Sequence, residues 1–203
     1  MKNWLYLIVG GSISGWMALA PLIVSSTGPV QAQEAAACAA SHARNAFLSG
    51  YLPVEGAKPV SSAAFIDGTG NSRTVEEWQG RPLLMNFWAT WCPPCVKELP
   101  SLSRLKSQLK SAGVDVVAIN VDKDDATEVS EFLSSVDARN LEPFRDPGRS
   151  MMKSARIASL PTTLLINADG HEVAAVLQDA KWDEPSIAAF IASCLGNKKT
   201  PGQ

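Results

Sequence analysis

Residues 86–100 hold two cysteines separated by two prolines, and they constrain the fold of this 203-residue chain more than any other stretch. The apolar run 83–88 has the length and the aromatic content of a buried strand. After a short turn, apolar residues recur at helical spacing from Val96 onward. Prolines are tolerated in a first helical turn, because the N–H groups there have no intrahelical partner. The sequence therefore predicts a strand, a turn and a helix, with Cys92 at the helix N-terminus and Cys95 in its first turn.

This arrangement suits a pair of cysteines that exchanges disulfides. A thiolate attacks a disulfide, and the positive end of a helix favours the thiolate form of Cys92. Cys95 is placed to attack the resulting mixed disulfide and to release the substrate as a dithiol. The alternative is half of a zinc site, which would need a second closely spaced pair of ligands. The remaining cysteines and histidines are scattered single residues: Cys38, His42, His171 and Cys194. We therefore expect a redox pair, with no metal and no other cofactor.

Two motifs connect the chain with a known family. They are Asn-Phe-Trp-Ala-Thr-Trp-Cys-Pro-Pro-Cys-Val-Lys-Glu-Leu-Pro at 86–100 and Leu-Pro-Thr-Thr at 160–163. With them the chain resembles the thioredoxin superfamily, and within it the TlpA-type (ResA-like) thiol–disulfide proteins, which are anchored in the membrane and face the periplasm. The resemblance extends over residues 35–195. It implies an α/β thioredoxin fold with a central mixed sheet flanked by helices, and a thiol:disulfide oxidoreductase acting on exported proteins.

The resemblance also implies an acid–base residue. Cytoplasmic thioredoxins usually carry a buried aspartate where this chain has Asn86, and an asparagine accepts no proton. In the TlpA-like branch the glutamate after the cysteines, here Glu98, takes the part of the acid–base helper. Glu98 follows Cys95 by three residues and so shares its helix face. The alternative for Glu98 is an ordinary solvated helix residue.

The substrate groove is expected on either side of the cysteines. The family places a cis proline opposite them, and Pro161 stands at that position. A cis peptide bond there would expose the backbone of Leu160 for pairing with an extended substrate. The alternative is an ordinary trans proline at the start of a strand. We expect Trp91 to be the exposed aromatic residue of the groove.

The N-terminal segment 1–24 decides the compartment. Residues 4–24 are almost continuously apolar and long enough to cross a bilayer, and Lys2 is the one charged side chain before Glu34. We expect a single membrane-spanning segment with its positive end inside, which anchors the protein to the inner membrane and leaves the rest in the periplasm. The alternative is a signal peptide cleaved near Ala32, which would leave a soluble periplasmic protein.

The chain has four cysteines, and two lie outside the motif. In an oxidising compartment Cys38 and Cys194 would most simply pair in a structural disulfide, tying an N-terminal helix to the last helix. The alternative is two unpaired buried cysteines.

The remaining sequence is divided into three further parts. Residues 25–62 read as a linker and an N-terminal helix with a loop over 49–62, residues 63–195 as the thioredoxin-like domain, and 196–203 as a polar tail. The elements expected in the domain are a small hairpin from 63, a turn capped by Thr74, a strand at 114–121, a helix at 126–136 capped by Asp124 or Asp125, a short strand or loop at 140–147, a short helix at 150–159, a hairpin at 162–177 and a last helix at 183–195.

The expected partners follow from charge and family. A formal net charge of −2 gives no sign of nucleic-acid binding. We expect a monomer that receives electrons from a membrane or periplasmic donor and acts on exported proteins with cysteine pairs. Among TlpA-like proteins such substrates are metallochaperones, oxidase subunits and apocytochrome c. Relatives of this type are reductants, and a negative charge on Glu98 would favour the oxidised form of the cysteine pair, which makes the reduced form a good electron donor.

Two other functions compete with this one. Copper chaperones of thioredoxin fold use a Cys-x-x-x-Cys pair with a distant histidine, and the spacing of Cys92 and Cys95 differs from it. Thiol peroxidases carry Pro-x-x-x-Thr-x-x-Cys, whereas Thr90 lies two residues before Cys92 and no proline takes the required place. Both are minor alternatives.

Overall fold

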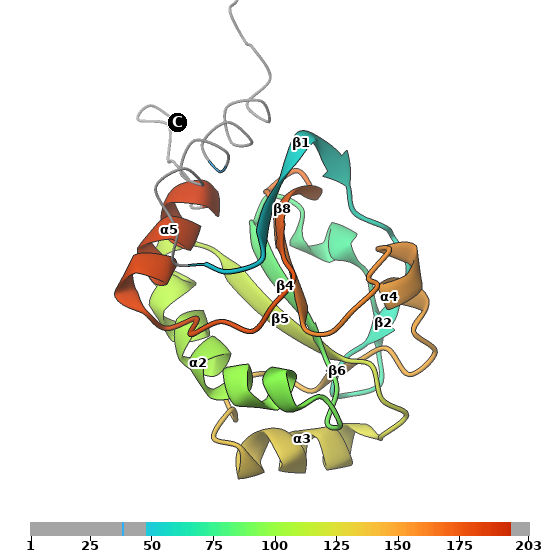
Figure 1. Ribbon diagram of the computed structural model, residues 1–203. Coiled ribbons are helices and arrows are strands. Elements are labelled where there is room, and N and C mark those ends of the chain that lie inside the picture. Colours follow the sequence, from blue (N-terminus) through green and yellow to red (C-terminus); the bar gives the residue numbers. More distant parts are fainter. Residues whose placement is uncertain (1–37, 39–47, 196–203) are drawn as a thin grey trace, which may run out of the picture.

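The computed structural model describes residue 38 and residues 48–195, and these residues build one mixed sheet flanked by helices (Figure 1). The sheet has eight strands in the order β1-β8-β7-β4-β5-β6-β2-β3. The strands are β1 (Tyr51–Pro59), β2 (Phe65–Ile66), β3 (Ser72–Arg73), β4 (Leu83–Trp88), β5 (Asp115–Asn120), β6 (Phe144–Arg145), β7 (Thr162–Ile166) and β8 (His171–Val176). The helical elements are η1 (Val75–Trp78), α2 (Pro93–Leu109), η2 (Lys110–Ala112), α3 (Ala126–Ser135), α4 (Ser150–Ser154) and α5 (Pro185–Leu195).

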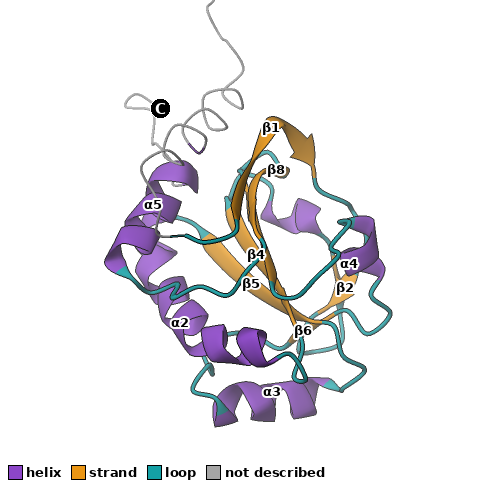
Figure 2. Cartoon of the chain, viewed as in Figure 1, coloured by secondary structure: helices purple, strands orange, loops and turns teal. Residues whose placement is uncertain are grey.

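Strand β4 lies in the middle of the sheet, and all six of its residues are buried. It pairs in parallel with β5 and antiparallel with β7, so the sheet is mixed as predicted. A strand covered on both faces needs a nearly continuous apolar run, which the sequence provides at 83–88 with Asn86 as the one polar residue. Figure 2 shows the helices outside the sheet, with α2 and α5 together on one side and α4 on the other. Strand β4 thus runs through the core and ends just before the turn that leads to Cys92.

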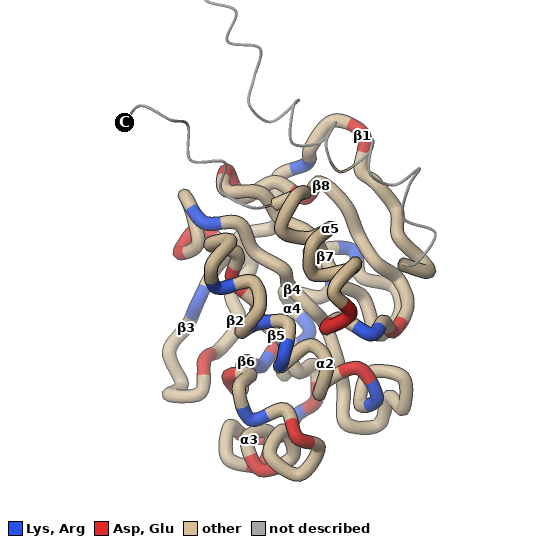
Figure 3. Tube along the Cα trace, turned by 90° about the vertical axis from the view of Figure 1, so that its left-hand side faces the viewer, with Lys and Arg blue, Asp and Glu red and all other residues tan. Residues whose placement is uncertain are grey.

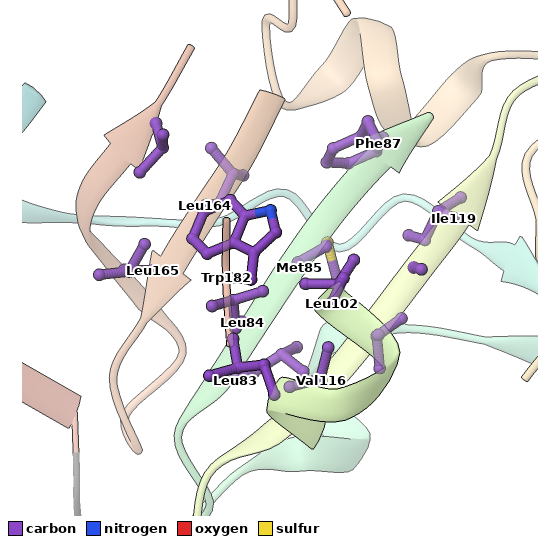
Figure 4. Close-up of a cluster of buried hydrophobic side chains, with 14 of the residues drawn as sticks. Leu83, Leu84, Met85, Phe87, Leu102, Val116, Ile119, Leu164, Leu165 and Trp182 are labelled. Carbon is purple, nitrogen blue, oxygen red and sulfur yellow. The ribbon is translucent and has the colours of Figure 1, made fainter. Parts of the chain in front are cut away.

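The core between the sheet and its helices is one continuous cluster of buried side chains. Figure 4 shows part of it, with residues from β4, β5, β7 and α2 and with Trp182 from the segment before α5. Trp88 and Phe87 are fully buried, so both fill core as predicted. Outside this core, basic and acidic residues are intermingled along the described chain (Figure 3).

The predicted loop at 49–62 is wrong, because β1 occupies most of it. Tyr51 pairs with Val176 of β8, and the register shifts between Pro53 and Lys58. Prolines and glycines indicate a loop, but they are tolerated on a strand at the edge of a sheet, where one row of N–H groups needs no partner. The ring of Tyr51 packs edge-on against Phe190 of α5 at a centroid distance of 5.2 Å, and this tertiary contact holds the strand in place. The sheet therefore includes residues that precede position 63.

Most of the other predicted elements are confirmed. The hairpin of β2 and β3 is present, and Thr74 forms a capping box with Glu77 at the start of η1. At α3 the cap is Asp125 and not Asp124: the Asp125 carboxylate accepts hydrogen bonds from the backbone N–H groups of Thr127 (2.7 Å) and Glu128 (3.0 Å). Such caps satisfy N–H groups that have no partner within the helix.

Several expectations fall outside the described residues. They are the apolar segment 4–24, the alternative cleavage site near Ala32, nearly all of the helix expected at 34–48, and the tail 196–203. Over residue 38 and residues 48–195, no helix has the length and apolar character needed to cross a membrane.

Candidate active site

The two cysteines of the motif are joined in a disulfide at the N-terminus of α2, with their Cα atoms 5.3 Å apart. Cys92 is the N-cap residue of the helix, with an extended backbone (φ −101°, ψ 98°), and its carbonyl accepts the hydrogen bond of the Val96 N–H at 3.0 Å. Cys92 is 5% exposed, whereas Cys95 is 0% exposed. The sulfur nearer the surface thus lies where the helix dipole and the free N–H groups stabilise a negative charge.

The turn before Cys92 is held by a buried carboxylate at the end of β5. The carboxylate of Asp122 accepts hydrogen bonds from the Thr90 backbone N–H (2.7 Å) and from Nδ2 of Asn120 (2.9 Å). Asn120 in turn accepts the backbone N–H of Asp122 at 2.9 Å. The turn that presents the cysteine is therefore fixed from the neighbouring strand, and the sequence analysis did not assign Asp122 to the site.

Glu98 is buried beneath the cysteines, with 2% of its surface exposed. Its Oε1 accepts a hydrogen bond from Nδ2 of Asn86 at 2.8 Å. Its Oε2 accepts one from Nε1 of Trp182 at 2.7 Å and one from the backbone N–H of Ala180 at 3.2 Å. A solvated helix glutamate is therefore excluded. Three N–H donors from β4 and from the segment before α5 surround this carboxylate.

Burial raises the pKa of Glu98 from 4.5 to about 7, because a charged carboxylate loses its hydration in the core. The hydrogen bonds from Trp182, Asn86 and Ala180 act in the opposite direction, and the negative charge of Asp179 adds to the increase. Glu98 can therefore gain or lose a proton near neutral pH. Asn86 cannot, but it orients the carboxylate that does.

The residues expected to line the groove lie at the same end of the sheet. Thr162 pairs with Phe87 across β7 and β4, so Pro161 comes opposite the end of β4 that leads into the cysteine turn. The Leu160–Pro161 peptide bond is cis. Trp91 is 61% exposed, and the guanidinium of Arg149 lies over its ring at 5.8 Å from the centroid. An aromatic residue thus stands free for contact beside Cys92.

A second disulfide joins Cys38 to Cys194 near the end of α5, across 156 residues, with the Cα atoms 4.9 Å apart. Both cysteines are buried. The hydroxyl of Tyr51 donates a hydrogen bond to the carbonyl of Cys38 at 3.3 Å, which links this disulfide to β1. The structure thus contains the pairing that the leftover cysteines suggested, in place of two free thiols.

The site contains partners that the sequence did not reveal. Trp182 and Ala180 contact Glu98 although they lie more than 80 residues away in the chain, and no local sequence pattern predicts such a contact. Arg149 follows a turn and precedes a short helix, which gives no indication of its position over Trp91. Within the described ranges, no three side chains of His, Cys, Asp or Glu gather in a way that could hold a metal ion.

The parallel β4–α2–β5 unit, the antiparallel β7–β8 pair and the disulfide at a helix N-terminus define a protein of thioredoxin fold. The Redoxin family model matches residues 55–191, and the chain belongs to that family. The thiol-disulfide oxidoreductase ResA of Bacillus subtilis is 31% identical over 132 residues, which are 65% of this chain and 73% of that protein. ResA of Bacillus thuringiensis subsp. konkukian is 31% identical over 118 residues, 58% of this chain and 65% of that protein. The resemblance to the ResA-like proteins is therefore confirmed, although the chain matches slightly less than two thirds of the length of some of these relatives.

Solved structures agree on the fold. A secreted thiol-disulfide isomerase from Corynebacterium glutamicum matches with a TM-score of 0.58 and 18% identity, over 71% of this chain and 92% of that one. A secreted disulfide oxidoreductase of Mycobacterium tuberculosis, homologous to E. coli DsbE, matches with a TM-score of 0.55 and 22% identity, over 65% of this chain and 96% of that one. The thioredoxin fold predicted from the motifs is confirmed.

Proposed function

We propose that the protein is a thiol:disulfide oxidoreductase that reduces disulfides in exported proteins. The observation that carries the proposal is the asymmetry of the Cys92–Cys95 pair: Cys92 caps the helix and keeps 5% of its surface exposed, while Cys95 is fully enclosed. A nucleophile must meet its substrate, whereas a resolving thiol needs only to meet the nucleophile. The names of the ResA relatives support the same reaction class.

The reaction starts from the reduced pair. The Cys92 thiolate attacks one sulfur of the substrate disulfide, forms a mixed disulfide and expels the other substrate sulfur as a thiolate. The Cys95 thiol then loses its proton and attacks the sulfur of Cys92. This step forms the Cys92–Cys95 disulfide and expels the second substrate thiolate. Two electrons have passed to the substrate, and its two sulfurs take up two protons.

Glu98 is proposed to accept the proton of Cys95. Both side chains are buried on the same face of α2, so bulk water is not at hand as a base. Since the pKa of Glu98 is raised to about 7, the carboxyl can accept a proton at neutral pH and later release it. Trp91, Leu160 and Pro161 are proposed to bind the substrate segment that surrounds its disulfide, through the exposed indole and the backbone of Leu160.

The periplasm is the proposed compartment. A structural disulfide between Cys38 and Cys194 persists only where the surroundings are oxidising. The apolar segment 4–24 is proposed to anchor the protein to the inner membrane, with release near Ala32 as the alternative. Retention with membranes through carbonate and high-salt washes supports the anchor, and a soluble mature form that starts at Gln33 would contradict it. Exported metallochaperones, oxidase subunits or apocytochrome c are the proposed substrates, and a membrane or periplasmic protein is the proposed electron donor.

The nucleophile is tested by insulin reduction. Cys92→Ala should lower the rate to that of the uncatalysed reaction, while Cys95→Ala should leave a thiol on Cys92 that alkylates at mildly acidic pH. Faster alkylation of Cys95 than of Cys92 under those conditions would reverse the assignment. Cys95→Ser should hold the mixed disulfide, and mass spectrometry of the trapped complex identifies the substrate.

The direction of electron flow is tested by equilibration with glutathione buffers, followed through the fluorescence of Trp91 beside the pair. We expect a reduction potential closer to that of thioredoxin, about −270 mV, than to that of the oxidant DsbA, about −120 mV. A midpoint more oxidising than about −180 mV, the value of protein disulfide isomerase, would contradict a reductase.

A further inference from the structure

We propose that Trp182 is a positioning residue of the active site, which holds the carboxylate of Glu98 through its indole N–H and so controls how readily Cys95 gives up its proton. The inference rests on the proposed function and extends it to a residue of the segment between β8 and α5. No pattern around the cysteines includes that segment.

Trp182 is attached to α2 at two points. Its indole Nε1 donates to Oε2 of Glu98 at 2.7 Å, and its backbone N–H donates to the hydroxyl of Ser101 at 3.1 Å. That hydroxyl lies 2.8 Å from the carbonyl of Glu98 and 3.3 Å from the carbonyl of Ala180. The side chain and the backbone of Trp182 therefore approach the same helical turn, and the indole has little freedom to leave the carboxylate.

A tryptophan can be buried in this core without a hydrogen bond to its indole N–H. Trp88 is also fully buried, but its Nε1 has no hydrogen-bond partner among the described residues. Its ring is held by stacking on Phe132 at a centroid distance of 5.7 Å. A short hydrogen bond to a carboxylate, as at Trp182, is about twice as strong as one between neutral groups. The two tryptophans thus have similar burial and differ in what the N–H contacts.

The groups that bind the Glu98 carboxylate are neutral N–H donors, and the charged residues nearby pair with one another. Over residues 48–195, no lysine or arginine forms an ion pair with Glu98. Lys97 beside it on α2 pairs with Asp179 at 3.0 Å. Arg104, further along α2, pairs with Asp183 at 2.6 Å, and Lys181 points into solvent as an exposed residue. From β4 comes the uncharged amide of Asn86.

The consequence is a defined effect of Trp182 on proton transfer. A hydrogen bond to the carboxylate favours its charged form, so the N–H of Trp182 lowers the pKa of Glu98 against the effect of burial. Without this donor Glu98 keeps its proton to higher pH. A protonated Glu98 cannot accept the proton of Cys95, and the mixed disulfide is then resolved more slowly at neutral pH.

Trp182→Phe in the full-length protein tests the proposal, because phenylalanine keeps most of the ring and removes the N–H. We expect the midpoint of the pH–rate profile of insulin reduction to move up by about one unit, with a rate loss of about tenfold below the midpoint and little loss above it. Trp88→Phe is the matched control, since it removes an indole N–H that has no described partner, and its midpoint should equal that of the wild type. Equal midpoints in all three proteins would overturn the proposal.

A second background separates positioning from general damage to the structure. In Glu98→Gln the carboxyl no longer titrates, so adding Trp182→Phe should move no midpoint. A shift of the same size in this background would show that Trp182 acts by another route and would overturn the proposal.

A readout without turnover separates this inference from the proposed function. The Glu98 carboxyl can be titrated in the oxidised protein by ¹³C NMR with labelled glutamate, using Glu98→Gln to assign the signal. An upward shift of its midpoint in Trp182→Phe supports the proposal, and an unchanged midpoint overturns it. If the wild-type protein failed to reduce insulin, the proposed function would fail, while this titration would still decide the contact.

Discussion

The two disulfides of this protein are built in opposite ways. Cys92 and Cys95 are three residues apart and lie at a helix N-terminus, with an exposed tryptophan beside them and a buried acid below. Cys38 and Cys194 are 156 residues apart and lie where α5 meets the N-terminal side of β1. The short pair is surrounded by groups that stabilise a thiolate or accept a proton. At the long pair, the sulfur of Cys38 lies 3.7 Å from the carbonyl oxygen of Cys194, and the Tyr51 hydroxyl donates a hydrogen bond to the carbonyl of Cys38.

This difference supports the proposal that one disulfide reacts with substrates while the other holds the chain together. A disulfide stabilises the folded protein by lowering the entropy of the unfolded chain. In the loop-closure model this stabilisation is on the order of 2 kcal/mol for a loop of a few residues and about 5 kcal/mol for a loop of more than 150 residues. The short pair can therefore open and close with modest effect on folding. The long pair contributes most of the covalent stabilisation.

The largest expected effect is on activity. Replacing Cys38 and Cys194 together with serine should leave insulin reduction close to the wild-type rate at temperatures where the variant is folded, whereas Cys92→Ala should abolish it. The physical reason is that only the short pair has a sulfur at a helix N-terminus near the surface. Loss of activity in the folded Cys38→Ser, Cys194→Ser variant would remove the distinction between the two disulfides.

The next effect is on stability. The same double serine variant should lose up to about 5 kcal/mol of unfolding free energy, against about 2 kcal/mol for Cys92→Ser with Cys95→Ser. Urea denaturation without reductant, followed by circular dichroism, measures both. Equal losses of unfolding free energy in the two variants would contradict the comparison, because loop length would then not determine how much each disulfide stabilises the protein.

A smaller effect is on the pH dependence of the unfolding free energy, and it comes from Glu98 beside the short pair. The pKa of Glu98 is about 7 in the folded protein and 4.5 in the unfolded chain, so folding favours its protonated form. The stabilisation is complete below pH 4.5 and is lost as the pH rises through 7, for a total of about 3 kcal/mol. Glutamine at position 98 mimics the protonated acid and does not titrate. Between pH 4.5 and 8 the unfolding free energy of Glu98→Gln should therefore fall by about 3 kcal/mol less than that of the wild type.

The measurement is the difference in urea midpoint between wild type and Glu98→Gln across that range. Burial also raises the pKa of Glu172, but its contribution is common to both proteins and cancels in the difference. A difference that stays constant with pH would show that Glu98 does not titrate in this range. The Cys38→Ser, Cys194→Ser variant is the control and should keep the wild-type pH dependence, because it leaves Glu98 and its hydrogen-bond donors Asn86 and Trp182 unchanged.

The last prediction concerns the number of reactive thiols in the denatured protein. With Cys92 and Cys95 reduced and blocked under native conditions, the denatured but unreduced protein should show no further reactive thiols, since both remaining sulfurs are joined. Two additional thiols after denaturation would mean that the long disulfide is absent in solution or opens as easily as the short one.

The sequence by itself determined the parts of the site that depend on neighbours along the chain. An apolar run, a short turn and a helix with prolines at its start fix Cys92 at the helix N-terminus, because strand burial and helix capping are local effects. The cap at Thr74 follows for the same reason, while at α3 the sequence left Asp124 and Asp125 open and the structure shows Asp125. Residues three apart on a helix share a face, so the relation of Glu98 to Cys95 was also readable.

The tertiary structure decided everything that depends on distant segments. Strand β1 forms in a sequence with loop composition because an edge strand tolerates proline and because Tyr51 packs on Phe190 of the last helix. Burial in the folded core raises the pKa of Glu98 to about 7, and the hydrogen bonds from Asn86 and Trp182, 12 and 84 residues away, act in the opposite direction. Burial and hydrogen bonding across such separations are properties of the folded core, and together they set the pKa of this helix glutamate.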